Sequence, residues 1–93
     1  MKNKKILKIR VNLDQLDIKL LKLIKQRAVL VNKILNEKKF KKEIIDKKRI
    51  NLILKSIKNK SIINGIDPKI TEKIWKAMIN AFIDYEYRNF KKK

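Results

Sequence analysis

The chain has 93 residues and a formal net charge of +18, with 27 lysines and arginines against nine aspartates and glutamates. It contains no cysteine and no histidine, which excludes disulfides, thiolate metal sites and catalysis by a histidine base. No apolar run reaches the roughly 20 residues that span a bilayer, and residues 1–7 lack the apolar core of a signal peptide, so we expect a cytoplasmic protein without a membrane partner. The length predicts one small domain, residues 1–93, with marginal stability as a single chain.

A heptad pattern in the first third of the chain predicts a very long first helix. Apolar residues recur there at alternating spacings of three and four, with one arginine among them: Leu13, Leu16, Leu20, Leu23, Arg27, Leu30 and Ile34. The pattern extends the helix from about Leu7 to about Lys38, which is roughly 48 Å at 1.5 Å per residue. A compact chain of this size has a radius of gyration of only about 12 Å, so the helix overhangs its own domain. The simplest partner for the overhang is a second copy, which predicts an intertwined homodimer.

Two further helices are predicted after a charged connector at residues 39–45. Asp46 is a favourable N-cap for a second helix that ends near Asn59. A turn at residues 61–67 contains the only glycine of the chain, and the Asp-Pro pair at its end starts a third helix that runs to about Phe90. The predicted fold is therefore all-α, with three helices per chain. We expect the tails, residues 1–6 and 91–93, to be disordered.

Charged residues interrupt the apolar faces of these helices. Arginine is scarce in this lysine-rich chain, where Arg10, Arg27, Arg49 and Arg88 are four of the 27 basic residues. The first three fall on faces that are otherwise apolar, as do Glu86 and, near the end of the long helix, Lys38. Arginine offers a planar, permanently charged fork that binds carboxylates bidentately, which lysine cannot do. Because buried cations need partners and few acids lie nearby, the set predicts a socket for a small polycarboxylate. The acids are not paired at ligand spacing, so we expect no metal and no cofactor.

The spacing of these residues along the chain is a further pattern. It takes in Ile9-Arg10, Leu13-Asp14, Leu16-Asp17, Leu20-Leu21, Arg27, Lys38, residues 46–49, residues 64–67 and Glu86. The register resembles that of the all-helical chorismate mutase family, which includes the isochorismate-pyruvate lyases of salicylate synthesis. The resemblance covers the chain from about Lys8 to Phe90. No single motif is distinctive, but the spacings together are specific.

The resemblance implies a dimer of three-helix chains with two equivalent sites and a dicarboxylate substrate, chorismate or isochorismate. It implies that Arg10 of one chain and Arg27 of the other hold the carboxylates of the substrate, while Lys38 bonds a carboxylate and the ether oxygen. Arg49 would close the site. Phe82, one helical turn before Glu86, would contact the substrate. Bacterial members commonly carry glutamine at the position that faces the ether oxygen, and here that position is Glu86.

The implied reaction, chorismate to prephenate, is pericyclic and needs no nucleophile, metal or obligatory general base. The site has to hold the dicarboxylate in its compact conformer and place donors at the ether oxygen, where negative charge develops. Lys38 and Arg27 can act as cations, but Glu86 can donate to that oxygen only when it is protonated. We therefore expect turnover to fall as the pH rises through the titration of Glu86.

Two positions at the start of the second helix bear on the substrate. Many mutases carry a glutamate that binds the ring hydroxyl where this chain has Ile50, and Ile50 cannot bind a hydroxyl. Asp46 keeps the acid that mutases have at the start of this helix, although an N-cap alone also explains it.

Two alternatives to a chorismate mutase remain open at this point. The lyase branch is also apolar at the position of Ile50 and matches the register without insertion or deletion, which favours an isochorismate-pyruvate lyase. The charge of +18 favours a basic helical protein that binds nucleic acid or a partner protein.

Overall fold

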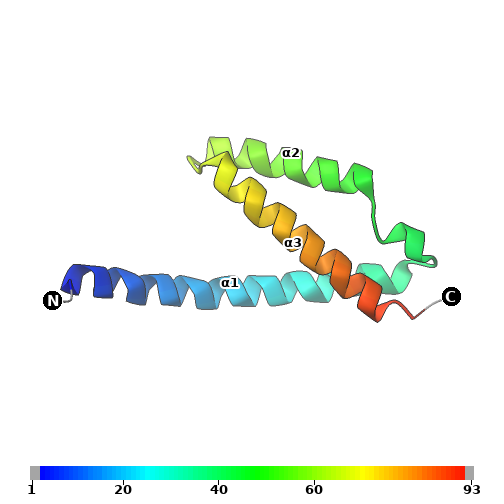
Figure 1. Ribbon diagram of the computed structural model, residues 1–93, viewed down its shortest axis with the longest axis horizontal. Coiled ribbons are helices and arrows are strands. Elements are labelled where there is room, and N and C mark those ends of the chain that lie inside the picture. Colours follow the sequence, from blue (N-terminus) through cyan, green and yellow to red (C-terminus); the bar gives the residue numbers. More distant parts are fainter. Residues whose placement is uncertain (1–2, 92–93) are drawn as a thin grey trace. The chain divides into compact units, whose positions relative to one another are not determined.

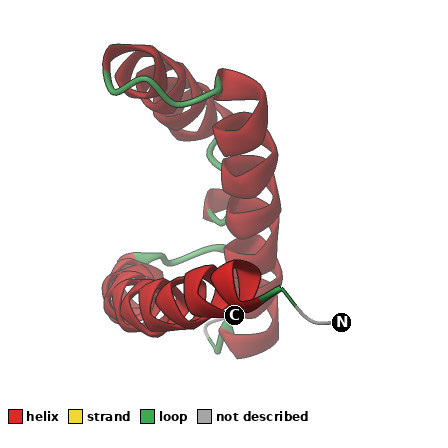
Figure 2. Cartoon of the chain, turned by 90° about the vertical axis from the view of Figure 1, so that its left-hand side faces the viewer, coloured by secondary structure: helices red, strands yellow, loops and turns green. Residues whose placement is uncertain are grey.

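The computed structural model describes residues 3–91 and confirms the all-α prediction over that range (Figures 1 and 2). Its elements are α1 (Lys4–Glu37), a short 3-10 helix η1 (Lys41–Glu43), α2 (Lys47–Ile63) and α3 (Pro68–Asn89). Figure 2 shows only helix and loop between residues 3 and 91. The chain divides into two compact units, Met1–Asn32 and Lys33–Lys93.

The long first helix begins earlier than the sequence predicted. Asn3 Oδ1 accepts hydrogen bonds from the backbone amides of Lys5 at 2.9 Å and Ile6 at 3.3 Å, which satisfies amides that have no partner within the helix. Residues 4–6 are therefore helical, although a disordered tail was expected there. Residues 1–2 and 92–93 of the two expected tails lie outside the described residues.

The first unit consists of α1 alone over its described part, and its apolar side chains are exposed. Between Ile6 and Leu30 the large apolar residues of α1 are 44% to 65% exposed, including Leu13, Leu16 and Leu20 of the heptad seam. A single helix has no neighbouring element within its unit against which to bury such a seam. Its apolar surface is of the kind that a second helical partner covers.

The second unit is built around the pairing of α2 with α3, which meet at the turn between them (Figure 1). Backbone amides of Asn64, Gly65 and Ile66 donate to carbonyls in the last turn of α2 at 3.0, 3.2 and 2.8 Å. Gly65 has a φ of 71°, the left-handed conformation that glycine adopts without steric cost. Asp67 then caps α3 by accepting from Lys69 N at 2.9 Å, with Pro68 in the first turn, as the sequence predicted.

The second helix runs four residues past the end predicted near Asn59, because Ser61 belongs to its last turn and not to the following loop. Ser61 Oγ lies 2.6 Å from the carbonyl oxygen of Ile57 and 2.7 Å from Thr71 Oγ1 on α3, and both hydroxyl residues are buried. A serine has one hydroxyl proton, so if it donates to Ile57 then Thr71 donates to Ser61. This pair joins α2 to α3 and fixes their register near the turn.

The buried hydroxyl pair predicts an unequal response to substitution. Ser61→Ala leaves Thr71 with only a long contact to Pro68 O at 3.4 Å, so we expect a loss of about 1–3 kcal/mol in the free energy of unfolding. Thr71→Val should cost less, because Ser61 keeps its bond to Ile57. The double variant should be no less stable than Ser61→Ala alone, as measured by urea denaturation. A double variant that loses the sum of the two single losses would contradict a coupled pair.

Candidate functional site

The second unit contains a partly buried ion pair between Lys38 and Glu86. Lys38 Nζ lies 2.8 Å from Glu86 Oε1, and the two side chains are 17% and 8% exposed. Lys38 Nζ also makes a long contact, 3.5 Å, with the carbonyl oxygen of Ile44. An ammonium group has three N–H donors, so these two contacts leave capacity for one further acceptor. The pair thus presents a fixed cation next to a carboxyl group, away from bulk water.

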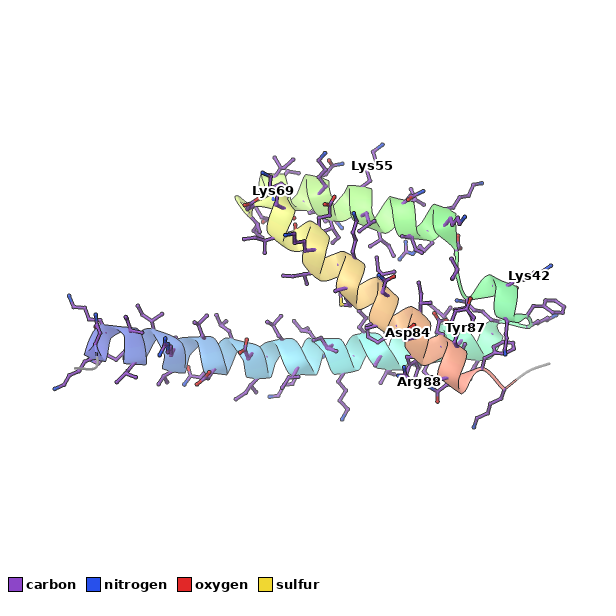
Figure 3. All side chains as sticks on the ribbon, in the orientation of Figure 1. Lys42, Lys55, Lys69, Asp84, Tyr87 and Arg88 are labelled. Carbon is purple, nitrogen blue, oxygen red and sulfur yellow. The ribbon has the colours of Figure 1, made fainter. Side chains whose placement is uncertain are left out.

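The helix period of α3 turns Glu86 inward. Asp84, Tyr87 and Arg88, labelled in Figure 3, are exposed, whereas Glu86 is only 6% exposed. Phe82 precedes Glu86 by one turn on the same face and is half-buried. The prediction that Glu86 lies on the apolar face of the third helix is therefore confirmed.

Lys38 follows directly on the last residue of α1, and a compact connector holds it there. The Lys38 amide donates to Leu35 O at 3.1 Å, and Leu35 and Ile44 are among the most buried apolar residues of the unit, at 4% and 3% exposure. Glu43 Oε2 accepts from the amides of Lys39 at 2.6 Å and Phe40 at 2.8 Å. We call this arrangement the Glu43 cap.

The Glu43 cap was missed by the sequence prediction, which described residues 39–45 as a charged, loop-like connector. A glutamate three residues after Phe40 has the spacing of the reciprocal half of a capping box, which is the signal that could have revealed it. The amide bonds from Phe40 and Lys39 hold the pKa of Glu43 below its ordinary value of 4.5, and the charges of Lys38 and Lys42 act in the same direction. Because the pKa is lowered, the cap is formed above pH 4.5 and is lost only as the pH falls through the lower, folded-state value.

The start of α2 carries the other three predicted positions. Asp46 is an N-cap, as predicted, and its Oδ1 accepts from Arg49 N at 3.1 Å. The side chain of Arg49 is exposed and that of Ile50 is half-buried. The expectation that Arg49 lies on a buried face is therefore wrong for the chain described here, because the first turn of α2 is at the surface of its unit.

Arg10 and Arg27 belong to the first unit. Arg10 is exposed, contrary to the buried face that the sequence suggested, while Arg27 is half-buried. Nothing within the first unit packs over the N-terminal part of α1, which is the reason that Arg10 is exposed. The two residues lie 17 positions apart on one helix, or about 25 Å at 1.5 Å per residue. That distance is far larger than a small dicarboxylate, so one chain cannot hold one such ligand with both.

Two surface pockets lack both Lys38 and Glu86. One, of about 260 Å³ at the start of α1, is lined by Asn3, Ile6, Leu7 and Arg10, the last of which is a predicted site residue. The other, of about 400 Å³ on α2 and α3, is lined by Leu54, Lys55, Lys58, Pro68, Lys69 and Glu72, none of which the sequence singled out as a site residue. Within residues 3–91 no group of three or more acids is placed to hold a metal ion. Over the same range, none of the helices combines the length and the apolar character required to cross a membrane.

Between residues 3 and 91 the chain is helical and carries an inward-facing pair of Lys38 and Glu86. The sequence profile of the family described as chorismate mutase type II matches residues 9–87. The chain therefore belongs to the chorismate mutase type II family, and the matched range includes Arg10, Arg27, Lys38, Arg49 and Glu86. Comparisons with the curated proteins and with the solved structures gave no significant match.

Proposed function

We propose that this protein is a chorismate mutase that rearranges chorismate to prephenate in a site centred on Lys38 and Glu86. The observation that carries the proposal is the buried pair itself, 2.8 Å long, inside a chain of this family. The rearrangement breaks one C–O bond as it forms one C–C bond within the same molecule, so no group is transferred to the protein. What the protein supplies is position and charge.

Each proposed site residue has a role that follows from its chemistry. Lys38 donates to the ether oxygen as negative charge develops there, and its confinement by Glu86 and Ile44 O means that little reorganisation is needed. Arg27 binds a carboxylate of the substrate bidentately. Arg49, exposed in the free chain, closes over the bound ligand, while Ile50 and Phe82 contact its carbon skeleton and Asp46 holds the start of α2.

We propose that the second carboxylate is bound by Arg10 from another copy of the chain. The separation of about 25 Å between Arg10 and Arg27 excludes their joint action on one small ligand within a chain. The exposed heptad seam of α1 supports the same conclusion, since Leu13, Leu16 and Leu20 need an apolar cover. The proposed assembly is a homodimer with two equivalent sites, each completed by its partner.

An isochorismate-pyruvate lyase is the second candidate, and Ile50 is the observation that favours it. A half-buried isoleucine at the start of α2 cannot bind a ring hydroxyl, and isochorismate carries its hydroxyl at a different ring position from chorismate. The carboxylate contacts and the donor at the ether oxygen serve both reactions. The two activities differ in their products, because the lyase releases pyruvate with salicylate and the mutase releases prephenate alone.

Removal of the Lys38 ammonium tests the site directly. We expect Lys38→Ala to lower kcat for chorismate by about two to three orders of magnitude or more, because a preorganised charge at the developing oxyanion is lost. Lys73→Ala, which removes an exposed lysine of α3, is the matched control and should retain wild-type turnover. If the two variants behave alike in a steady-state assay, the ion pair is not the catalytic centre.

The pH dependence of turnover tests the role of Glu86. A carboxyl group donates to the ether oxygen only when it is protonated, and the ionised form that pairs with Lys38 cannot donate. If Glu86 is the donor, kcat should therefore fall as the pH rises. Glu86→Gln donates at every pH, and its profile between pH 4.5 and 8.5 should be flat. A flat wild-type profile, or a variant profile with the slope of the wild type, would exclude Glu86 as the donor.

Mixed dimers test whether Arg10 acts across subunits. Arg10→Ala and Lys38→Ala should each be nearly inactive alone, but a heterodimer of the two contains one site with both native residues. Random reassociation of equal amounts should restore about a quarter of the wild-type activity. If Arg10 acted within its own chain, every site in the mixture would lack one residue and no activity would return.

A further inference from the structure

The Glu43 cap connects directly to the position of Lys38. Glu43 Oε2 accepts from the amides of Lys39 and Phe40, the first two residues after Lys38, at 2.6 and 2.8 Å. These are short bonds to a charged acceptor, the stronger class of hydrogen bond. The Glu43 carboxylate therefore fixes the backbone of the two residues that follow Lys38.

The other end of the connector also returns to Lys38. Glu43 N donates to Phe40 O and Ile44 N donates to Lys41 O, both at 3.0 Å, which forms the turn of η1. Ile44 then enters the apolar interior, with 3% exposure, and its carbonyl oxygen lies 3.5 Å from Lys38 Nζ. Glu43 thus stabilises a turn that starts directly after Lys38. The turn ends at Ile44, whose carbonyl oxygen contacts the Lys38 ammonium group.

Resting on the proposed function, we propose that Glu43 is a positioning residue for Lys38. It does not touch the substrate but holds the connector in the conformation in which the Lys38 ammonium lies beside Glu86. Without the carboxylate, residues 39–44 would gain backbone freedom, and ordering them again costs free energy at each turnover. That cost reduces the preorganisation on which charge stabilisation of the transition state depends.

The charges around Glu43 keep the cap formed in the working pH range. The charges of Lys38 and Lys42 lower the pKa of Glu43, and Lys42 Nζ lies 5.6 Å from the centre of the Phe40 ring. Lys42 itself projects outward from η1 (Figure 3). The two amide donors and the charges of Lys38 and Lys42 favour the ionised carboxylate, so neutral and mildly acidic solutions leave the cap intact.

The test compares Glu43→Ala and Glu43→Gln with Glu72→Ala, which removes an exposed glutamate of α3 that lies outside the proposed site. Glu43→Ala should lower kcat for chorismate by about tenfold with a smaller change in KM, because Lys38 acts in the transition state. Glu43→Gln keeps an oxygen acceptor for both amides and should recover most of the lost rate. Glu72→Ala should have wild-type kinetics and a wild-type melting temperature. Glu43→Ala should still unfold in one cooperative transition, at a lower melting temperature because the cap bonds are lost.

Two further measurements separate positioning from a structural effect. In the Lys38→Ala background, Glu43→Ala should cause no additional loss of kcat, since there is no ammonium left to position. The Lys38 side-chain ammonium should give a resolved ¹⁵N–¹H NMR signal in the wild type, and Glu43→Ala should broaden or abolish it. An unchanged Lys38 signal with unchanged kcat in Glu43→Ala, or additive losses in the double variant, would overturn the proposal.

The NMR measurement also keeps the two proposals apart. If the wild-type protein turns over neither chorismate nor isochorismate, the proposed function fails. The response of the Lys38 signal to Glu43→Ala would still decide whether Glu43 positions that ammonium. A normal wild-type turnover with no response of Lys38 would refute the positioning role alone.

Discussion

The ion pair between Lys38 and Glu86, which is largely shielded from water, needs close contact and additional hydrogen bonds from the second unit. Moving two charged groups out of water costs several kcal/mol per ion, and only close geometry and additional hydrogen bonds compensate for it. The chain provides a 2.8 Å contact and a carbonyl oxygen from Ile44, which lies 3.5 Å from Lys38 Nζ. For stability alone, a pair of apolar residues would serve as well or better. The proposed site for an anionic ligand would account for a charged pair at this position.

Other features of the same unit keep the two partners in place. The Ser61–Thr71 pair joins α2 to α3 near the turn between them. On the other side, the end of α1 and the connector determine where Lys38 lies. The ion pair joins residues 48 positions apart in the sequence, so it depends on the tertiary structure on both sides.

Several local features of the fold were predicted from the sequence, whereas the Asn3 and Glu43 caps and the tertiary contact of Ser61 were not. The heptad spacing predicted a long first helix, and Asp46 and Asp67-Pro68 correctly marked the starts of α2 and α3, because caps act within one turn. The Asn3 cap and the length of α2 were missed, the latter because the buried partner of Ser61 lies on another helix. The spacing of apolar residues placed Lys38 and Glu86 on inward faces. Only the family resemblance implied that both face the ether oxygen of one substrate. The exposed positions of Arg10 and Arg49 show that a pattern of apolar spacing identifies a face and does not establish what covers it.

The absence of histidine and cysteine from the sequence agrees with a reaction that needs only shape and charge. The central claim is that this site acts on a dicarboxylate enol ether, and the most direct measurement is turnover of chorismate and of isochorismate by the purified protein at pH 5 and pH 8. Substrate loss would be followed together with the formation of prephenate, pyruvate and salicylate. The account predicts prephenate from chorismate, formed faster at pH 5. Formation of pyruvate and salicylate from isochorismate, with little prephenate from chorismate, would move the assignment to the lyase. No turnover of either substrate at either pH would contradict the account.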